Sequence, residues 1–366
     1  MKNKICHITT VHNAKDTRIF QKECVSLAKH GFDTHLIVAN QKSETDQGVQ
    51  IHNIISTTSG RVQRMRKTTR LAFEKAMEID ADIYHFHDPE LLPVGKKLKA
   101  KGKRVIFDSH EDVPLQIYNK PYLPNLLRPL VSKVYAWYEK SVLKKLDAII
   151  IAGPGYDERM KKINPNTICI YNFPILKNSK IAIWEKKENE IAYVGTLLKE
   201  RGIKEMISSM STVDAKFNLA GKWHFENYKS EVMNLSGWEK VKFWGFVNRD
   251  EINRIHNRSK IGVCTLMPIA TYLDAYPVKM FEYMAAGIPC VISNFPMLQK
   301  VMDEENCGIC VDPTNPKSIA KAINYLLANE DIAKQMGKNG RKAIEEKYNW
   351  KTQEEKLIKL YEQILK

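Results

Sequence analysis

Short apolar strands alternate with helical segments along the whole chain, and this order constrains the fold more than any other feature of the sequence. Such alternation is typical of parallel sheets with crossover helices. In the first half we expect strands at Lys4–Thr10, Thr34–Val38, Ile83–Phe86, Arg104–Phe107 and Ala148–Ile151. In the second half we expect strands at Glu190–Val194, Lys216–Leu219, Val241–Trp244, Ile261–Thr265 and Cys290–Ile292. The chain is therefore predicted to be an α/β protein with two doubly wound sheets whose strand C-termini face one central cleft.

The two series of strands are separated by residues 164–180, a stretch rich in Asn and Pro that is predicted to be a linker. At 366 residues the chain suits two domains of about 180 residues each. We expect an N-terminal domain at 1–172 and a C-terminal domain at 173–350. The last segment, 351–366, is predicted to be a helix that begins with a capping box at Thr352–Glu355 and packs back onto the first domain. Its apolar residues form one stripe, at Leu357, Ile358, Tyr361, Ile364 and Leu365.

Composition narrows the class of protein. Hydrophobic residues make up 43% of the chain, but no apolar run approaches the ~18 residues of a membrane-spanning helix. The first residues are too polar for a signal peptide. The seven cysteines are odd in number and lie mostly in apolar segments, which indicates a cytoplasmic protein rather than a disulfide framework. Cys307 and Cys310 have the spacing of half a zinc or redox site, but no second pair is near and the segment is predicted to be a strand.

The formal net charge of +15 favours an anionic partner. A nucleotide, an acidic membrane and a nucleic acid all qualify, but the sequence lacks the helix-turn-helix, zinc-finger and aromatic RNA-binding patterns, so nucleic acid is disfavoured. Between Tyr118 and Lys145, basic and aromatic residues interleave beside an apolar stripe. This segment is predicted either to lie on the anionic inner face of the cell membrane or to cover the sheet as an ordinary amphipathic helix. The stripe consists of Leu126, Leu127, Leu130 and Val134.

One segment says most about function. Asp274 is followed eight positions later by Glu282, in Asp-Ala-Tyr-Pro-Val-Lys-Met-Phe-Glu. A helix is expected to start near Tyr276 and Pro277 and to stop at Gly287, which puts Glu282 near its middle and Asp274 in the loop before it. Two carboxylates in one crevice suit the binding of sugar hydroxyls, which need acceptors in fixed places. The alternative is a solvated helix that carries two acids.

Polar clusters follow three strands of the first half. His110 lies just beyond a strand, between Asp108 and Glu111. The other clusters are His12-Asn-Ala-Lys-Asp16-Thr-Arg18 and His85-Phe-His87-Asp88. Because ligands of such sheets bind at strand C-termini, these side chains are candidates for a binding site. Asp80-Ala-Asp82 has the pattern of a metal site but precedes its strand, so we interpret it as a helix end and predict no metal.

The segment 274–293, together with Gly195-Thr-Leu-Leu-Lys-Glu-Arg-Gly202 and Phe243-Trp-Gly-Phe-Val247, resembles the retaining nucleotide-sugar glycosyltransferases of family four. The resemblance spans the chain, with stronger motifs in the second half. It implies the GT-B fold, in which two Rossmann-like domains, an N-terminal acceptor domain and a C-terminal donor domain, face a central cleft.

The resemblance also implies roles for individual residues. Glu282 matches the glutamate that holds the donor ribose, and Asp274, one methylene shorter than the usual glutamate, matches the acid near the transferred sugar. Arg201 takes the place of a phosphate-binding cation, whereas Thr196 after Gly195 replaces the arginine that the family usually has there. His110 matches a histidine near the donor phosphate and sugar. The remaining donor-side residues are Tyr276 and Pro277, with Phe246 and Val247 at the turn that holds the base. Lys279, one helical turn before Tyr283, is expected either to reach a phosphate or to be solvated.

The acceptor is expected on the first half, where the family often has a glycine-rich loop that this chain lacks. Side chains are expected to take its place: His12, Asp16, Arg18, His87, Asp88 and Glu111. The predicted activity is a cytoplasmic, metal-independent hexosyl transfer, with retention, from a nucleotide diphosphate sugar (a UDP-sugar by preference) to a saccharide or polyprenyl-linked acceptor, in bacterial surface polysaccharide synthesis. The alternatives are an epimerase or phosphorylase on the same fold, or a catalytically silent subunit that binds the sugar nucleotide.

Overall fold

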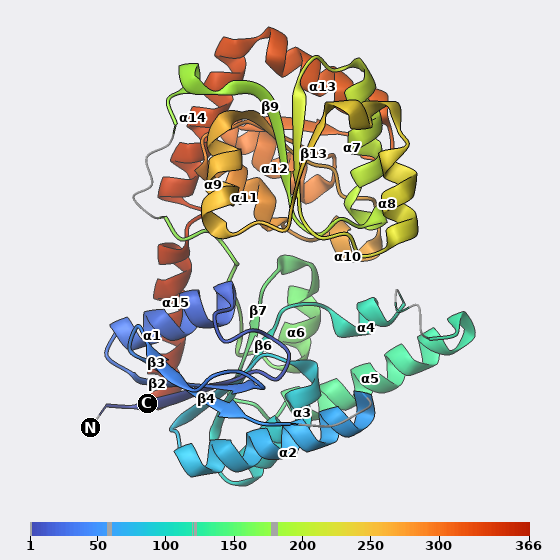
Figure 1. The fold of residues 1–366 in the computed structure, drawn as a ribbon. Coiled ribbons are helices and arrows are strands. Elements are labelled where there is room, and N and C mark those ends of the chain that lie inside the picture. Colours follow the sequence, from blue (N-terminus) through green and yellow to red (C-terminus); the bar gives the residue numbers. More distant parts are fainter. Residues whose placement is uncertain (1, 57–60, 119, 121–122, 177–181) are drawn as a thin grey trace. The chain divides into compact units, whose positions relative to one another are not determined.

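The computed structural model describes residues 2–366 except 57–60, 119, 121–122 and 177–181. The chain divides into two compact units: an N-terminal unit of Met1–Asn172 with Trp350–Lys366, and a C-terminal unit of Phe173–Asn349. Each unit is a mainly parallel sheet with helices packed on it (Figure 1). The predicted α/β class with two parallel sheets is confirmed.

The sheet of the N-terminal unit has the strand order β3-β4-β2-β1-β5-β6-β7-β8 among the described residues. Its neighbours are parallel except for β3, which runs antiparallel to β4. Because the chain moves outward from β1 in both directions, the change of direction falls between the neighbours β1 and β5. The strands are β1 Lys4–Ile8, β2 Asp33–Ala39, β3 Glu44–Asp46, β4 Val49–Ile54, β5 Ile83–Phe86, β6 Arg104–Ser109, β7 Ala148–Ile151 and β8 Thr167–Cys169.

Side chains of this sheet alternate between its two faces. Cys6 and Tyr84 belong to the core that α2, α3 and α5 cover, whereas Ile5 and Ile83 belong to the core under α15. A π-helical segment, η1 Thr17–Cys24, precedes α1. The helices are α1 Val25–Lys29, α2 Arg61–Ile79, α3 Leu92–Ala100, α4 Val113–Ile117, α5 Arg128–Leu143, α6 Asp157–Ile163 and α15 Trp350–Leu365.

The sheet of the C-terminal unit has the order β11-β10-β9-β12-β13-β14, and all its neighbours are parallel. Here the direction changes between β9 and β12. The strands are β9 Glu188–Val194, β10 Lys216–Ala220, β11 Val241–Gly245, β12 Ser259–Cys264, β13 Cys290–Ser293 and β14 Gly308–Val311. The helices are α7 Ile203–Ser209, α8 Glu226–Met233, α9 Arg249–Arg258, α10 Ala270–Leu273, α11 Val278–Ala285, α12 Pro296–Glu305, α13 Pro316–Ala328 and α14 Glu330–Glu346.

The C-terminal helix α15 closes the N-terminal unit. Leu357 and Tyr361 are fully buried against β1, β5 and β6, and the Trp350 indole donates a hydrogen bond to Ser26 Oγ at 2.9 Å. The predicted apolar stripe therefore faces a core. The predicted capping box is wrong, because the helix already begins at Trp350 and Thr352 lies within its first turn.

Two local predictions also needed correction. The segment 164–180 is not linker from its start, because Thr167–Cys169 forms β8 and pairs with β7. Its residues 177–180 lie outside the described part of the chain. The hairpin of β3 and β4 was missed, although Gln47 and Gly48 at its turn both have positive φ, at 49° and 82°.

All seven cysteines are free thiols. Among the described residues, no helix has both the length and the apolar character needed to cross a bilayer.

Candidate active site

The predicted donor residues of the C-terminal unit gather where the sheet changes direction. Gly195 directly follows β9, and Thr265 directly follows the neighbouring strand β12. Gly202, directly after Arg201, packs closely against Thr265, because a Cβ on Gly202 would lie 2.0 Å from the Thr265 carbonyl oxygen. The loop that ends in Arg201 therefore lies next to this edge, and Gly202 has a φ of 69° there. Ligands of doubly wound sheets bind at this edge. The backbone geometry thus brings Arg201 to the place where a ligand is expected.

Lys279 lies across Gly195. A Cβ on Gly195 would fall 2.3 Å from Lys279 Cε and 2.6 Å from its Nζ, so the ammonium lies directly against the Gly195 backbone. The Nζ atom also lies 5.3 Å from the centre of the Tyr193 ring. Burial lowers the pKa of Lys279, and the nearby Arg201 guanidinium lowers it further. The two cations are therefore close enough to repel each other, an arrangement that an anion between them would relieve.

Arg201 retains unused donor capacity. Its guanidinium carbon lies 4.9 Å from the centre of the Tyr272 ring, and its buried Nε has no hydrogen-bond partner within the described residues. The same holds for the buried hydroxyl of Thr265. Buried polar groups are normally satisfied, so these two point to a polar ligand. Thr265 was predicted from the sequence only as the end of a strand, without a role in the site.

Glu282 is the fifth residue of α11, and its side chain is only 16% exposed. Its Oε1 lies 2.5 Å from Arg249 Nη1, on α9. Burial would raise the pKa of Glu282, but Arg249 and His256 outweigh it, so the pKa is lowered and the group is held as a carboxylate. No local pattern around Arg249 indicated this pairing, because it joins two helices 33 residues apart in sequence.

The other predicted donor residues lie nearby in sequence but differ in exposure. Asp274 is exposed at the end of α10, and its side chain makes no ion pair or hydrogen bond within the described part of the chain. Thr196 is exposed, and its carbonyl accepts a hydrogen bond from the Tyr193 hydroxyl at 3.1 Å. Phe246 is 86% exposed, whereas Val247 is buried. The remaining two lie at the start of α11: Pro277 is its N-cap, and Tyr276 contacts Phe281 edge to face.

In the N-terminal unit, the structure joins the three polar clusters into one network. His110 Nε2 lies 3.2 Å from Asp108 Oδ2 and 3.3 Å from His87 Nδ1. His12 completes the network, because its ring centre is 5.2 Å from that of His110 and its Nε2 is 3.4 Å from Asp88 Oδ1. The side chains of His12 and His110 are 33% and 21% exposed. These two histidines are the part of the network that a substrate can reach.

Burial makes the prediction of direct acceptor contact wrong for Arg18, Asp88 and His87. Arg18 is buried, with Nε and Nη2 donating to the two oxygens of Asp108 at 2.7 and 2.9 Å. Its Nη1 donates to the Ile170 carbonyl, so its three nitrogens are engaged inside the unit. Asp88 and His87 are each 2% exposed, and Asp88 accepts hydrogen bonds from the Thr9 and Thr10 side chains.

Asp16 has a structural task of its own, since its Oδ1 caps η1 by accepting from the amides of Arg18 and Ile19. Glu111 is exposed and accepts a hydrogen bond from Gln116. His87, Asp88 and Glu111 lie just after strands as predicted, whereas Asp16 and Arg18 belong to the start of η1. The sequence alone did not indicate which of these side chains turn inward.

Comparison with known proteins decides the family. The family model described as "Glycosyltransferase Family 4" matches residues 18–173, and the model described as "Glycosyl transferases group 1" matches residues 175–343. Together they account for most of both units. The chain is a family 4, group 1 glycosyltransferase. The resemblance that the motifs carried is thereby confirmed.

Individual relatives of this glycosyltransferase are distant. An uncharacterized glycosyltransferase of Methanocaldococcus jannaschii is 29% identical over 179 residues, covering 48% of this chain and 45% of the relative. O-antigen chain mannosyltransferase C of Escherichia coli is 21% identical over 303 residues, covering 80% and 78%. The chain matches about half the length of the first curated relatives.

Solved structures confirm the GT-B fold. A sucrose-phosphate synthase from Thermosynechococcus elongatus has a TM-score of 0.77 at 16% identity, with 99% of both chains covered. HepE of Anabaena, solved in complex with UDP and glucose, has a TM-score of 0.73 at 13% identity, covering 99% of this chain and 100% of HepE. At these identities the likeness concerns the fold alone.

Proposed function

We propose that this glycosyltransferase transfers a hexosyl group from a nucleotide diphosphate sugar, preferably a UDP-sugar, to a saccharide or polyprenyl-linked acceptor. The observation that carries the proposal is the meeting of Arg201, Lys279 and Glu282 at the edge where ligands of such sheets bind. A carboxylate for ribose hydroxyls and two cations for a diphosphate match the parts of a nucleotide sugar. Related proteins named for capsular polysaccharide and O-antigen synthesis, and HepE solved with UDP-glucose, support a role in bacterial surface glycan assembly.

In the proposed mechanism, negative charge grows on the diphosphate as the glycosidic bond breaks. Arg201 and Lys279 stabilise that charge, together with backbone amides at the starts of the neighbouring helices. Asp274 and His110 position the transferred sugar, and the departing phosphate accepts the proton of the acceptor hydroxyl. The acceptor is assigned to the surface around His12 and His110. Anomeric configuration is retained, and the transfer at the cytoplasmic side of the membrane requires no metal at the diphosphate.

Donor binding followed by turnover tests the proposal. UDP, GDP, ADP and their sugars are compared by thermal shift, and the donor that binds is then incubated with saccharide and polyprenyl-linked acceptors. We expect stabilisation by a UDP-sugar, release of free UDP only when an acceptor is present, and an α-linked product from an α-linked donor by proton NMR. If no nucleotide sugar raises the melting temperature, or if the product is inverted, the proposal in this form is wrong.

Four apolar side chains on α5 and the turn before it are exposed to solvent and form a row. This row is a candidate surface for reaching a membrane-bound acceptor. Leu126 is 93% exposed, Trp137 73%, Leu130 61% and Val134 57%. The interpretation that this stripe covers the sheet is therefore wrong; the sheet-facing residues of α5 are instead Val142 and Leu143. Exposed lysines flank the row: Lys133, Lys140, Lys144 and Lys145. We propose that this surface docks on an anionic membrane face, since apolar and basic residues combine there.

Flotation with vesicles tests this surface. The double variant Leu130→Asp/Trp137→Asp is expected to bind vesicles containing anionic lipid about tenfold or more weakly than the unchanged protein, because two large apolar groups no longer enter the bilayer interface. Ile55→Asp is the control, since Ile55 is 69% exposed in the same unit but lies outside the row. Equal binding of all three proteins at physiological salt, or equal binding to zwitterionic vesicles, would contradict the proposal.

A further inference from the structure

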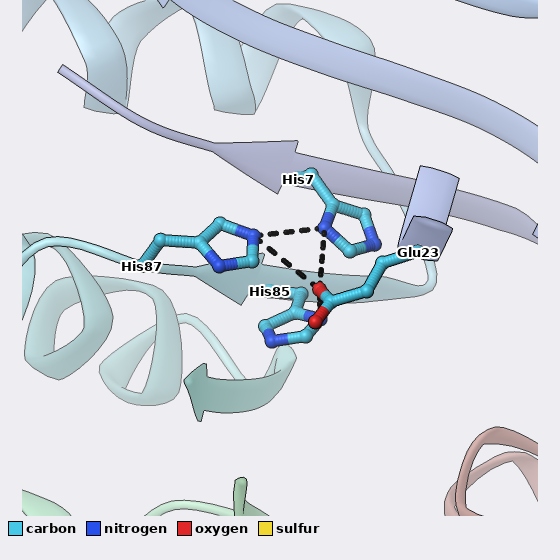
Figure 2. Close-up of side chains that lie close together, drawn as sticks. All are labelled: His7, Glu23, His85 and His87. Carbon is cyan, nitrogen blue, oxygen red and sulfur yellow. Dashed lines mark hydrogen bonds and ion pairs between the residues drawn. The ribbon is translucent and has the colours of Figure 1, made fainter. Parts of the chain in front are cut away.

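Four polar side chains meet in the interior of the N-terminal unit, beneath the network of His12 and His110. They are His7, Glu23, His85 and His87 (Figure 2). His7, Glu23 and His85 are fully buried and His87 is 2% exposed. Their facing atoms all lie within 4.8 Å of one another. Three imidazoles and a carboxylate are a ligand set that suits a zinc ion in a closed, structural site.

Strand pairing explains why the three histidines share one place. His7 on β1 is paired directly with His85 on β5, and His87 follows two residues later. Since side chains alternate along a strand, His85 and His7 point to the same face of the sheet. Glu23 reaches them from η1, whose π-helical turn differs from an α-helix and is a feature frequent at functional sites. The pairing of β1 with β5 therefore brings the three histidines together, and η1 adds Glu23.

Charge is the reason to expect a cation among them. The Arg18 guanidinium gives two hydrogen bonds to Asp108, so its charge is matched there. Glu23 Oε1 lies 3.1 Å from the Nε of the same arginine, whereas burial and the nearby Asp108 carboxylate raise the pKa of Glu23. Its Oε2 lies 3.9 Å from His7 Nδ1, 3.9 Å from His87 Nε2 and 4.0 Å from His85 Nδ1, too far for hydrogen bonds. A buried carboxylate without such partners is costly, and a cation between these atoms removes the cost.

The separations suit such an ion. Zinc bonds of about 2.0–2.1 Å in a tetrahedron place neighbouring ligand atoms about 3.3 Å apart. The observed separations begin below that value, at 2.9 Å between His7 Nδ1 and His87 Nε2, and all lie within 4.8 Å, so the side chains must move toward one another to close the site.

In known zinc sites the second ring nitrogen of each histidine is held by a hydrogen bond, and here this is so for His87 and His7 but not for His85, whose buried Nε2 has no partner among the described residues. His87 Nδ1 lies 3.3 Å from Asp108 Oδ2, which leaves Nε2 for the metal. His7 Nε2 lies 3.1 Å from the Tyr361 hydroxyl, which leaves Nδ1. That hydroxyl is also 2.6 Å from His85 Nδ1, a contact that metal binding replaces.

We propose that His7, Glu23, His85 and His87 bind one zinc ion that stabilises the N-terminal unit. The sequence predicted no metal, because the four ligands are spread over 81 positions and match no spacing motif. The zinc ion is structural, and its ligands belong to a different unit from Arg201, Lys279 and Glu282. Tyr361, whose hydroxyl contacts His7 Nε2, lies on α15. The ion would therefore also help to hold α15 against the sheet.

Metal analysis of the purified full-length protein, with any affinity tag removed, tests the proposal. We expect about one zinc per chain by mass spectrometry of the elements, and a lower melting temperature after treatment with a chelator that added zinc reverses. X-ray absorption should show only nitrogen and oxygen neighbours around the zinc. Sulfur neighbours would assign the ion to cysteines and overturn the proposal, as would a protein that is folded without zinc and takes up none when zinc is added.

Variants separate this site from adventitious binding to histidines. Glu23→Gln should lose zinc, and Tyr361→Phe, which keeps all four ligands, should bind zinc about 10–100-fold more weakly. His52→Ala is the matched control: His52 forms a similar close pair with His35, at 2.8 Å, elsewhere in the same unit. It should keep its zinc. If Glu23→Gln does not fold, the Tyr361→Phe affinity still decides, and zinc loss in His52→Ala equal to that in Tyr361→Phe would contradict the proposal.

Discussion

Replacing Glu282 with alanine should weaken binding of the nucleotide sugar by roughly 100-fold or more, because hydrogen bonds that a carboxylate accepts from the two ribose hydroxyls contribute about 1.5–3 kcal/mol each. The pKa of Glu282 is lowered, so the carboxylate is ionised and ready to accept both hydrogen bonds at neutral pH. Isothermal calorimetry with the donor and with the free nucleoside diphosphate measures the loss. Both ligands should be affected, since both contain the ribose.

The ion pair with Arg249 supplies the control for this experiment. If Glu282 served only to hold Arg249, then Arg249→Ala would weaken donor binding as much as Glu282→Ala. We expect a smaller loss for Arg249→Ala than for Glu282→Ala, since Arg249 is 56% exposed and helps to keep the Glu282 carboxylate ionised but is not expected to contact the ribose. Equal losses in the two variants would remove Glu282 from the donor site. Glu282→Gln, of the same size, guards against a packing defect.

Removing the guanidinium of Arg201 should lower kcat about 100- to 1,000-fold, the loss typical of a group that stabilises charge only in the transition state. The buried Nε of Arg201 has no hydrogen-bond partner among the described residues, and the Arg201 guanidinium lowers the pKa of the nearby Lys279. Both observations indicate a site that can bind a diphosphate. Arg201→Lys should recover only part of the rate, because lysine keeps the charge but cannot bind oxygens in bidentate fashion. Lys279→Met should show a loss of the same kind.

Lys199 is the control cation for Arg201. It is exposed and lies two residues earlier in the same short helical turn, Lys199–Arg201, so a general effect of positive charge near the site would appear in Lys199→Ala as well. Steady-state rates with saturating donor are compared for the folded variants. A kcat of Arg201→Ala within about twofold of the unchanged enzyme would exclude it from stabilising the leaving group.

The sequence predicted the order of elements well because each strand or helix is specified by nearby residues. The β5 strand, Ile83–Phe86, and the β7 strand, Ala148–Ile151, were predicted to the residue. The β3–β4 hairpin was missed because β3, Glu44–Asp46, is polar and has only three residues. The start of α15 was misplaced because a capping-box pattern recurs by chance inside a helix.

The site was predicted in part for a similar reason. Strand ends carry functional side chains in doubly wound sheets, so His12 and His110 became candidates from position, whereas Gly195 and Arg201 became candidates through the family resemblance. Partners were not. Arg249, Thr265 and the ligand set around Glu23 became visible only in the folded chain, since each depends on which strands and helices are neighbours.

The sequence by itself determined the two α/β halves, the family and the positions of the polar strand ends, because these follow from local periodicity and contiguous motifs. Only the tertiary structure decided which charged side chains are buried and what they face. Arg18 was expected to face an acceptor and instead neutralises Asp108; Glu23, with no expected role, faces three histidines. The physical reason is that sheet order and pleat, set by contacts far apart in the chain, fix the direction of each side chain.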